Sequence, residues 1–209
     1  MLKAIFNRRY VPHTIAVLLV VVSLLVIAIP PEARLGSIIR IVLLHGALAR
    51  AGLVIFAVAG VLGIGLLIRP GDRLGSWTVA TQQTAFAVWL AAALTSTVAT
   101  YLSWGMFIAW AEPRTQGTAK ILVLCLVLLL LVLWIKQHRF TGLVNAVLAV
   151  FAWLTVMQAT SVQHPENPVG SSTSIVFQVI FVALVGVLIL TALQFTRWIH
   201  RPRSVATAV

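Results

Sequence analysis

The stretch of sequence that decides the fold is IVLLHGALARAGLVIFAVAGVLGIGLLI, at residues 41–68. Its only side chains that are not apolar or small are His45 and Arg50. A helix needs about 20 predominantly apolar residues to cross the roughly 30 Å hydrocarbon core of a bilayer. This run exceeds that length, so it predicts a transmembrane helix that tilts or projects from the bilayer.

Five further apolar runs accompany this one along the chain. An open sheet would leave unsatisfied backbone groups at its edges in lipid, so each run is predicted to be a helix. The six runs lie at about 11–29, 41–68, 78–102, 119–135, 143–160 and 174–196. Residues 1–209 are therefore predicted to form a single domain, an all-α, polytopic six-transmembrane-helix bundle whose partner is the lipid bilayer.

Composition agrees with a membrane protein and argues against other classes. The chain is 61% hydrophobic and 9% charged, whereas soluble domains carry about 25% charged residues. The net charge of +11 resides in short connections between apolar runs, where membrane topology requires it, so we expect no nucleic-acid partner. The single cysteine, Cys125, lies inside an apolar run, which excludes an internal disulfide and a cysteine-based metal site.

The basic residues predict the orientation of the bundle. The connections on one side of the predicted bundle hold most of the lysine and arginine residues. The connections on the other side hold the acidic residues Glu32, Glu112 and Glu166. Lysine and arginine concentrate on the cytoplasmic side, so both chain ends are predicted to lie inside, as N-in/C-in, in the inner (cytoplasmic) membrane. The inner set is Lys3, Arg8, Arg9, Arg69, Arg73, Lys136, Arg139, Arg197, Arg201 and Arg203, and the outer set is Arg34, Arg40, Arg114 and Lys120.

Few residues could carry chemistry, and none forms an enzymatic motif. No carboxylate pair, phosphate-binding glycine loop, Ser-His-Asp order or CxxC is present, so no enzyme is expected. Two histidines, His45 and His164, fall at the outer face, on either side of an aromatic stretch at 101–114. Two imidazoles can occupy the axial positions of a haem iron, and Arg40 and Arg114 could face the haem propionates. Aromatic residues also form interfacial belts without any ligand, which leaves both interpretations open.

Two segments resemble a known family. The sequence from Arg40 to His45 resembles the Arg-Ile-x-x-x-His segment that opens the second helix in the heme exporter protein C and cytochrome c assembly protein family. The 104–114 segment resembles that family's tryptophan-rich segment, Trp-Gly-x-Trp-Trp-x-Trp-Asp-x-Arg, and His164 matches its second outer histidine. The sequence departs from the family where Phe107, Ile108 and Ala111 replace two tryptophans and the aspartate.

The resemblance implies a function and a set of site residues. It implies that a b-type haem is bound transiently, with His45 and His164 as axial ligands. It implies further that the haem passes to a periplasmic haem chaperone with help from ABC transporter subunits of the cytochrome c maturation system. The other implied haem contacts are Trp104, Gly105, Phe107, Trp110, Arg40 and Arg114.

Other functions remain as alternatives. One is a non-catalytic structural membrane subunit of a larger redox or transport complex. An intramembrane b-type cytochrome would need histidines near mid-membrane, where the predicted topology has none. Two local predictions can be tested by a structure. Arg50 should face protein or an outer cavity rather than lipid, and residues 104–110 should lie along the interface, bent at Gly105, with Trp104 and Trp110 turned toward the histidines.

Overall fold

The computed structural model describes residues 8–160, 169 and 172–200, and helices dominate this part of the chain. Six of them are long and apolar enough to cross a membrane, so the described chain is an all-α, multi-pass membrane protein, as predicted. The elements are the short 3-10 helix η1 (Arg8–Tyr10) and the helices α2 (Val11–Ala28), α3 (Ile39–Ile68), α4 (Asp72–Trp104), α5 (Pro113–Ile135), α6 (His138–Gln158) and α7 (Ile175–Ile199).

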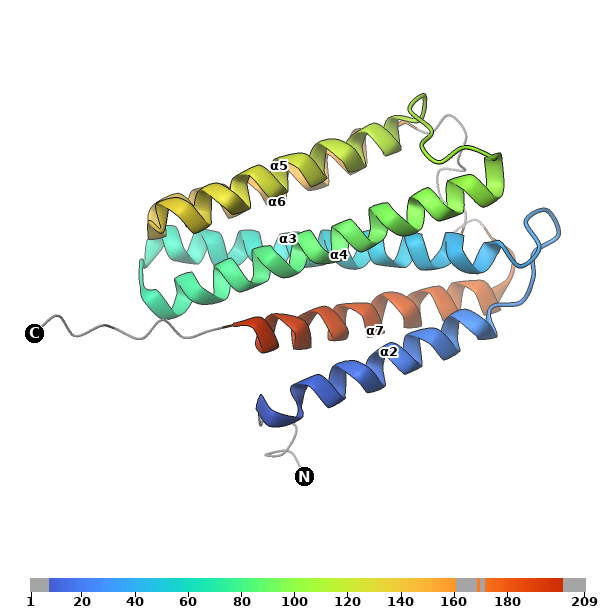
Figure 1. Ribbon diagram of the computed structural model, residues 1–209, viewed down its shortest axis with the longest axis horizontal. Coiled ribbons are helices and arrows are strands. Elements are labelled where there is room, and N and C mark those ends of the chain that lie inside the picture. Colours follow the sequence, from blue (N-terminus) through green and yellow to red (C-terminus); the bar gives the residue numbers. More distant parts are fainter. Residues whose placement is uncertain (1–7, 161–168, 170–171, 201–209) are drawn as a thin grey trace, which may run out of the picture.

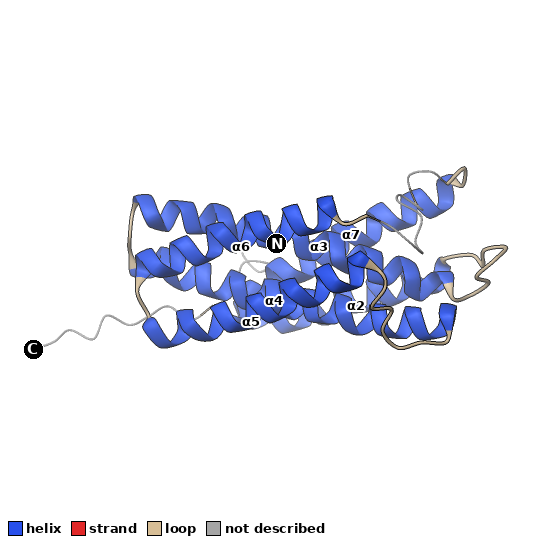
Figure 2. Cartoon of the chain, turned by 90° about the horizontal axis from the view of Figure 1, so that it is seen from above, coloured by secondary structure: helices blue, strands red, loops and turns tan. Residues whose placement is uncertain are grey.

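The helices lie side by side and alternate in direction, so the connections gather at two ends (Figures 1 and 2). One end, here called the basic end, holds η1, the α3–α4 and α5–α6 connections and the end of α7. The other, here called the His45 end, holds connections 29–38 and 105–112. Helices α3 and α4 form the central pair, α3 also packs on α6 and α7, and α2 packs mainly on α7.

Three helices begin well before the apolar runs that predicted them. Helix α4 begins at Asp72, α5 at Pro113 and α6 at His138, each five or six residues earlier than the start of its run. A helix can continue through polar residues beyond the hydrocarbon. Proline suits the first turn of α5 because a backbone N–H at that position would have no partner within the helix. At the basic end the added first turns of α4 and α6 contact each other, since His138 Nε2 lies 3.1 Å from Asp72 Oδ1.

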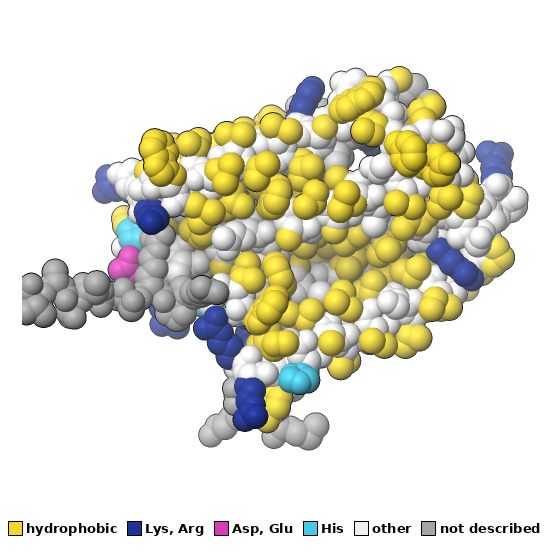
Figure 3. All heavy atoms as spheres, viewed as in Figure 1, with side chains coloured by type: hydrophobic (Ala, Val, Ile, Leu, Met, Phe, Trp, Pro, Cys, Tyr) yellow, Lys and Arg dark blue, Asp and Glu magenta, His cyan; other side chains and the backbone are white. Residues whose placement is uncertain are grey.

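The sides of the bundle are apolar along their length (Figure 3). Large side chains such as Val61, at 68% exposed, and Trp134, at 79%, lie on this surface. Lysine and arginine side chains lie mainly toward the two ends in the same view. Exposed valine and tryptophan side chains in such numbers indicate that lipid, not water, surrounds the helices.

Polar side chains of α4 face the interior of the bundle. Thr81, Gln82 and Thr84 are buried. Asn145 on α6 donates a hydrogen bond of 3.2 Å from Nδ2 to Gln82 Oε1. Thr196 on α7 donates one of 2.8 Å to Thr84 Oγ1. These bonds join α4 to two neighbouring helices where lipid offers no alternative partner.

Candidate functional site at the His45 end

The connection between α2 and α3 is fixed by a tight turn. The backbone N–H groups of Glu32 and Gly36 each donate to the other's carbonyl, at 3.1 and 2.7 Å. Gly36 has a φ of +55°, which favours glycine. Hydrogen bonds from the N–H groups of Leu35 and Arg34 lower the pKa of the Glu32 carboxyl. The carboxylate therefore holds the turn that leads into α3.

Arg40 lies just after this turn and joins two helices. Its Nε donates a hydrogen bond of 3.0 Å to the carbonyl of Ile29, which follows the last residue of α2. A cation at the C-terminal end of a helix is favoured by the helix dipole. The structure thus gives Arg40 a role in holding α2 against α3, which the sequence prediction of a propionate contact did not include.

His45 is half-buried in the second turn of α3 and is held by α4. Its Nδ1 lies 2.9 Å from the carbonyl oxygen of Ala92. Because a carbonyl only accepts hydrogen bonds, Nδ1 carries the proton and Nε2 carries the lone pair. This is the arrangement found in metal-binding histidines, whose second nitrogen donates to a carbonyl or carboxylate. Ala92 O also accepts a bond of 3.0 Å from Thr95 Oγ1.

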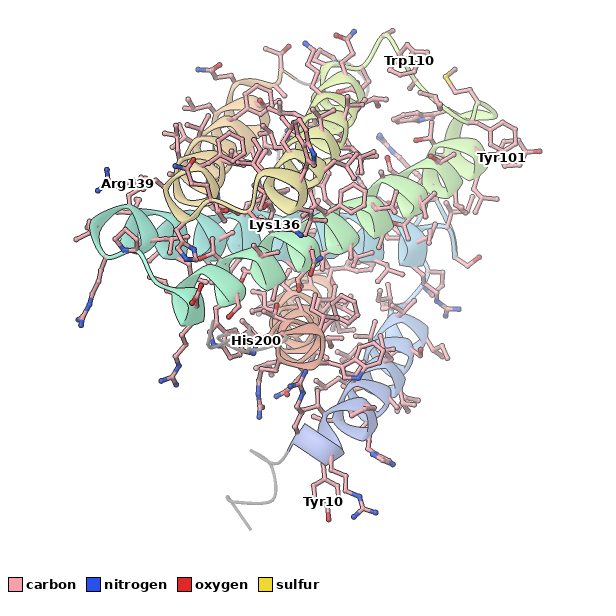
Figure 4. All side chains as sticks on the ribbon, turned by 60° about the vertical axis from the view of Figure 1, so that its left-hand side comes forward. Tyr10, Tyr101, Trp110, Lys136, Arg139 and His200 are labelled. Carbon is pink, nitrogen blue, oxygen red and sulfur yellow. The ribbon has the colours of Figure 1, made fainter. Side chains whose placement is uncertain are left out.

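The aromatic segment bends at Gly105, as predicted. Trp104 is the last residue of α4, and Gly105 follows with a φ of +72° and an N–H bond of 2.9 Å to Tyr101 O. The chain is then irregular up to Glu112. Phe107 stacks on Tyr101 with ring centroids 4.5 Å apart. Trp110 is 58% exposed, and Figure 4 places it on this connection, at the same end as Tyr101 and away from Lys136, Arg139 and His200.

Two other residues of the segment are turned inward. Ala109 and Glu112 are buried, at 2% and 0% exposed. The carbonyl of Glu112 accepts bonds from the N–H groups of Thr115 and Gln116 in the first turn of α5. A buried acid next to a proline at a helix start is a pattern that sequence reasoning could have used, since carboxylates favour the positive end of the helix dipole.

A cavity of about 680 Å³ lies at the same end, between α3, α5, α6 and α7. Arg50 and Arg114 are both part of its wall. Arg50 therefore faces a cavity, but Val182 of the same wall is 71% exposed on the side of the bundle, so the prediction that Arg50 avoids lipid stays a prediction. Arg40 is not part of this wall, so the structure places Arg50 and Arg114 at one cavity. The predicted contact of Arg40 and Arg114 with haem propionates stays a prediction.

The predicted site residues gather at one end but at two levels. Trp104 follows Ala92 by twelve residues of α4, which corresponds to about 18 Å along the helix axis. The aromatic segment therefore lies beyond His45 rather than beside it. His164, the second predicted ligand, lies outside the described residues. In the described ranges, no group of three or more His, Cys, Asp or Glu side chains forms a metal site.

These observations define the class of protein as a six-helix, multi-pass membrane protein with a carbonyl-bound histidine near one end. Comparisons with known proteins add no closer relationship, because no family model, curated protein or solved structure matches the chain.

Proposed function

We propose that this protein binds haem transiently at the His45 end and passes it to a periplasmic haem chaperone during c-type cytochrome maturation. ABC transporter subunits of that system would assist. In this proposal the basic end faces the cytoplasm, since the excess of lysine and arginine lies there, and the His45 end faces outward. The membrane is then the inner, cytoplasmic membrane of a bacterial cell.

The observation that carries the proposal is the hydrogen bond from His45 Nδ1 to Ala92 O, at 2.9 Å. It fixes the ring against α4 and sets the tautomer in which Nε2 has a lone pair for iron. His164 would supply the second axial nitrogen in this proposal.

The aromatic segment supports the proposal through its place and its geometry. Gly105 turns the chain back over the end of α4, and the segment presents Phe107 and Trp110 as exposed aromatic faces. Apolar ring faces suit a porphyrin plane. Because the segment lies about 18 Å farther along α4 than Ala92, Phe107 and Trp110 would contact the porphyrin from beyond His45 in this proposal.

Replacement of His45 by alanine tests the proposal. The purified His45→Ala variant, made in a haem-sufficient host, should retain at least about tenfold less haem per protein than the wild type. Loss of a direct ligand should cost no less than loss of an outer partner of a metal site, for which the range is about 10- to 100-fold. Added imidazole should restore part of the haem content by occupying the vacated axial position. The Soret absorbance per protein measures both effects.

His13→Ala is the matched control, because His13 is exposed in the first turn of α2 at the basic end. It should leave the haem content unchanged. Equal haem content in His45→Ala and wild type would show that His45 is not a ligand. A wild-type protein without any Soret band would favour the structural-subunit alternative.

A further inference from the structure

The cavity with Arg50 and Arg114 is distinct from the His45 position. Arg50 follows His45 by five residues, which places the two side chains about 140° apart around α3. His45 contacts α4 through Ala92 O, whereas Arg50 faces the space between α3, α5, α6 and α7. A ligand in this cavity is therefore not the ligand that His45 would bind.

Arg50 lies far along α3 for a charged residue, although its side chain is exposed. It is eleven residues from Ile39, so its Cα lies about 17 Å along an α3 helix that is about 45 Å long. This depth is within the expected hydrocarbon region. Side chains on a helix tilt toward its N-terminus, so Arg50 extends toward the His45 end, where Arg114 lies in the first turn of α5.

The charge of Arg50 has no counterpart within the described residues. No hydrogen bond or ion pair there involves its side chain. The cavity wall in the described ranges has two arginines and no aspartate or glutamate. A guanidinium at this depth is costly without an anion or water, so the cavity favours an anionic occupant. Arg114 contributes a second positive charge, beside the positive dipole end of α5.

Apart from Gln158 and Thr160, the rest of the wall is apolar, and it opens onto the side of the bundle. It includes Leu53 and Val54 of α3 and Val182 and Val185 of α7. Val182 is 71% exposed and so lies on the surface that faces lipid. An occupant with an anionic head and a hydrocarbon chain could enter from the membrane and remain partly in it.

We propose that this cavity is a binding site for an anionic phospholipid of the surrounding membrane. The phosphate lies between the guanidinium groups of Arg50 and Arg114, which match its oxygens by paired, charge-assisted hydrogen bonds. One acyl chain lies along Leu53, Val54, Val182 and Val185. The lipid neutralises Arg50 and links α3, α5 and α7 at the His45 end.

Lipid retention in the purified full-length protein tests this proposal. The probe is phosphatidylglycerol in nanodiscs of phosphatidylcholine, with retained lipid counted by native mass spectrometry after release. The wild type should retain phosphatidylglycerol, and Arg50→Gln should lower its retention by about tenfold or more, as expected for loss of a charged hydrogen-bonding partner. Arg114→Gln should lower it as well.

Lys120→Gln is the matched control, since Lys120 is exposed on α5 and is not part of the cavity wall. It should retain lipid as the wild type does. Arg50→Lys, which keeps the charge but not the planar fork, should retain an intermediate amount. This second variant tests the site if Arg50→Gln does not fold.

Two outcomes would overturn the proposal. Equal retention in Arg50→Gln, Arg50→Lys and Lys120→Gln would show annular lipid only. Unchanged lipid with lost Soret absorbance in Arg50→Gln would assign the cavity to haem propionates instead. Failure of the haem proposal is separate, because it would appear in His45→Ala, for which we expect unchanged lipid retention.

Discussion

Replacement of Trp89 by alanine should lower the free energy of unfolding by about 3 kcal/mol, the low end of the range for removing a buried aromatic side chain. The low end applies because moving an apolar side chain from lipid into the bundle gains little free energy, so helices in lipid associate mainly through packing. Trp89 is 2% exposed at the α3–α4 contact. Its ring meets Phe56 edge-on, with centroids 5.7 Å apart.

The surroundings of Trp89 leave little room for the bundle to close over the missing ring. Its Nε1 donates a bond of 3.2 Å to Thr118 O on α5, so the variant also leaves that carbonyl without this donor. A Cβ on Gly52 would lie 2.9 Å from the Trp89 ring, which shows how closely α3 already approaches. The cavity that forms should therefore persist, and three helices lose a shared contact.

Reversible unfolding of the protein in mixed lipid–detergent micelles, followed by helical circular dichroism during an SDS titration, measures this effect. Trp134→Ala is the matched control, because Trp134 is 79% exposed on α5. Its replacement should change stability by less than about 0.5 kcal/mol. Similar losses in the two variants would contradict the assignment of Trp89 to the packed core.

The number and order of the membrane helices could be predicted because hydrocarbon thickness imposes a minimum length on every apolar run that crosses it. The helix ends could not, since residues such as Asp72 and Pro113 continue a helix after the apolar run has stopped. In water-exposed turns the helix is limited by local caps, not by hydropathy. The bend at Gly105 was predictable because a glycine in a short connection permits a positive φ.

The partners of the site residues were less accessible to sequence reasoning. His45 is bound by the carbonyl of Ala92, and Arg40 by that of Ile29. Every residue has a carbonyl, so such partners leave no mark in the sequence. Arg50 and Arg114 line one cavity because of how α3, α5, α6 and α7 are arranged around it, which leaves no mark in the sequence. Helix α3 has apolar and small residues on all sides, so the direction predicted for Arg50 came from the cost of its charge in lipid and not from the residue pattern of α3.

Replacement of Gly63 by leucine should have an effect as large as that of Trp89→Ala, a loss of about 3 kcal/mol or more, because it overfills a backbone contact. A Cβ on Gly63 would lie 2.7 Å from Gly142 O and 3.1 Å from Ala146 N. A Cβ on Gly142 would in turn lie 2.8 Å from Gly63 O. Helices α3 and α6 thus touch through their backbones, and a backbone atom cannot rotate away as a flexible side chain can.

Side chains of increasing size at position 63 should lower stability in steps. Gly63→Ala should cost about 1–3 kcal/mol, less than Gly63→Leu, in the same SDS titration. Gly186→Leu is the matched control on α7, since a Cβ there would meet nothing within 4 Å. That variant should keep or slightly raise stability, because leucine has a higher helix propensity than glycine. Equal stability of Gly63→Leu and Gly186→Leu would mean that α3 and α6 do not approach through Gly63. A loss confined to the Gly63 variants would instead confirm that α3 and α6 touch through their backbones at this position.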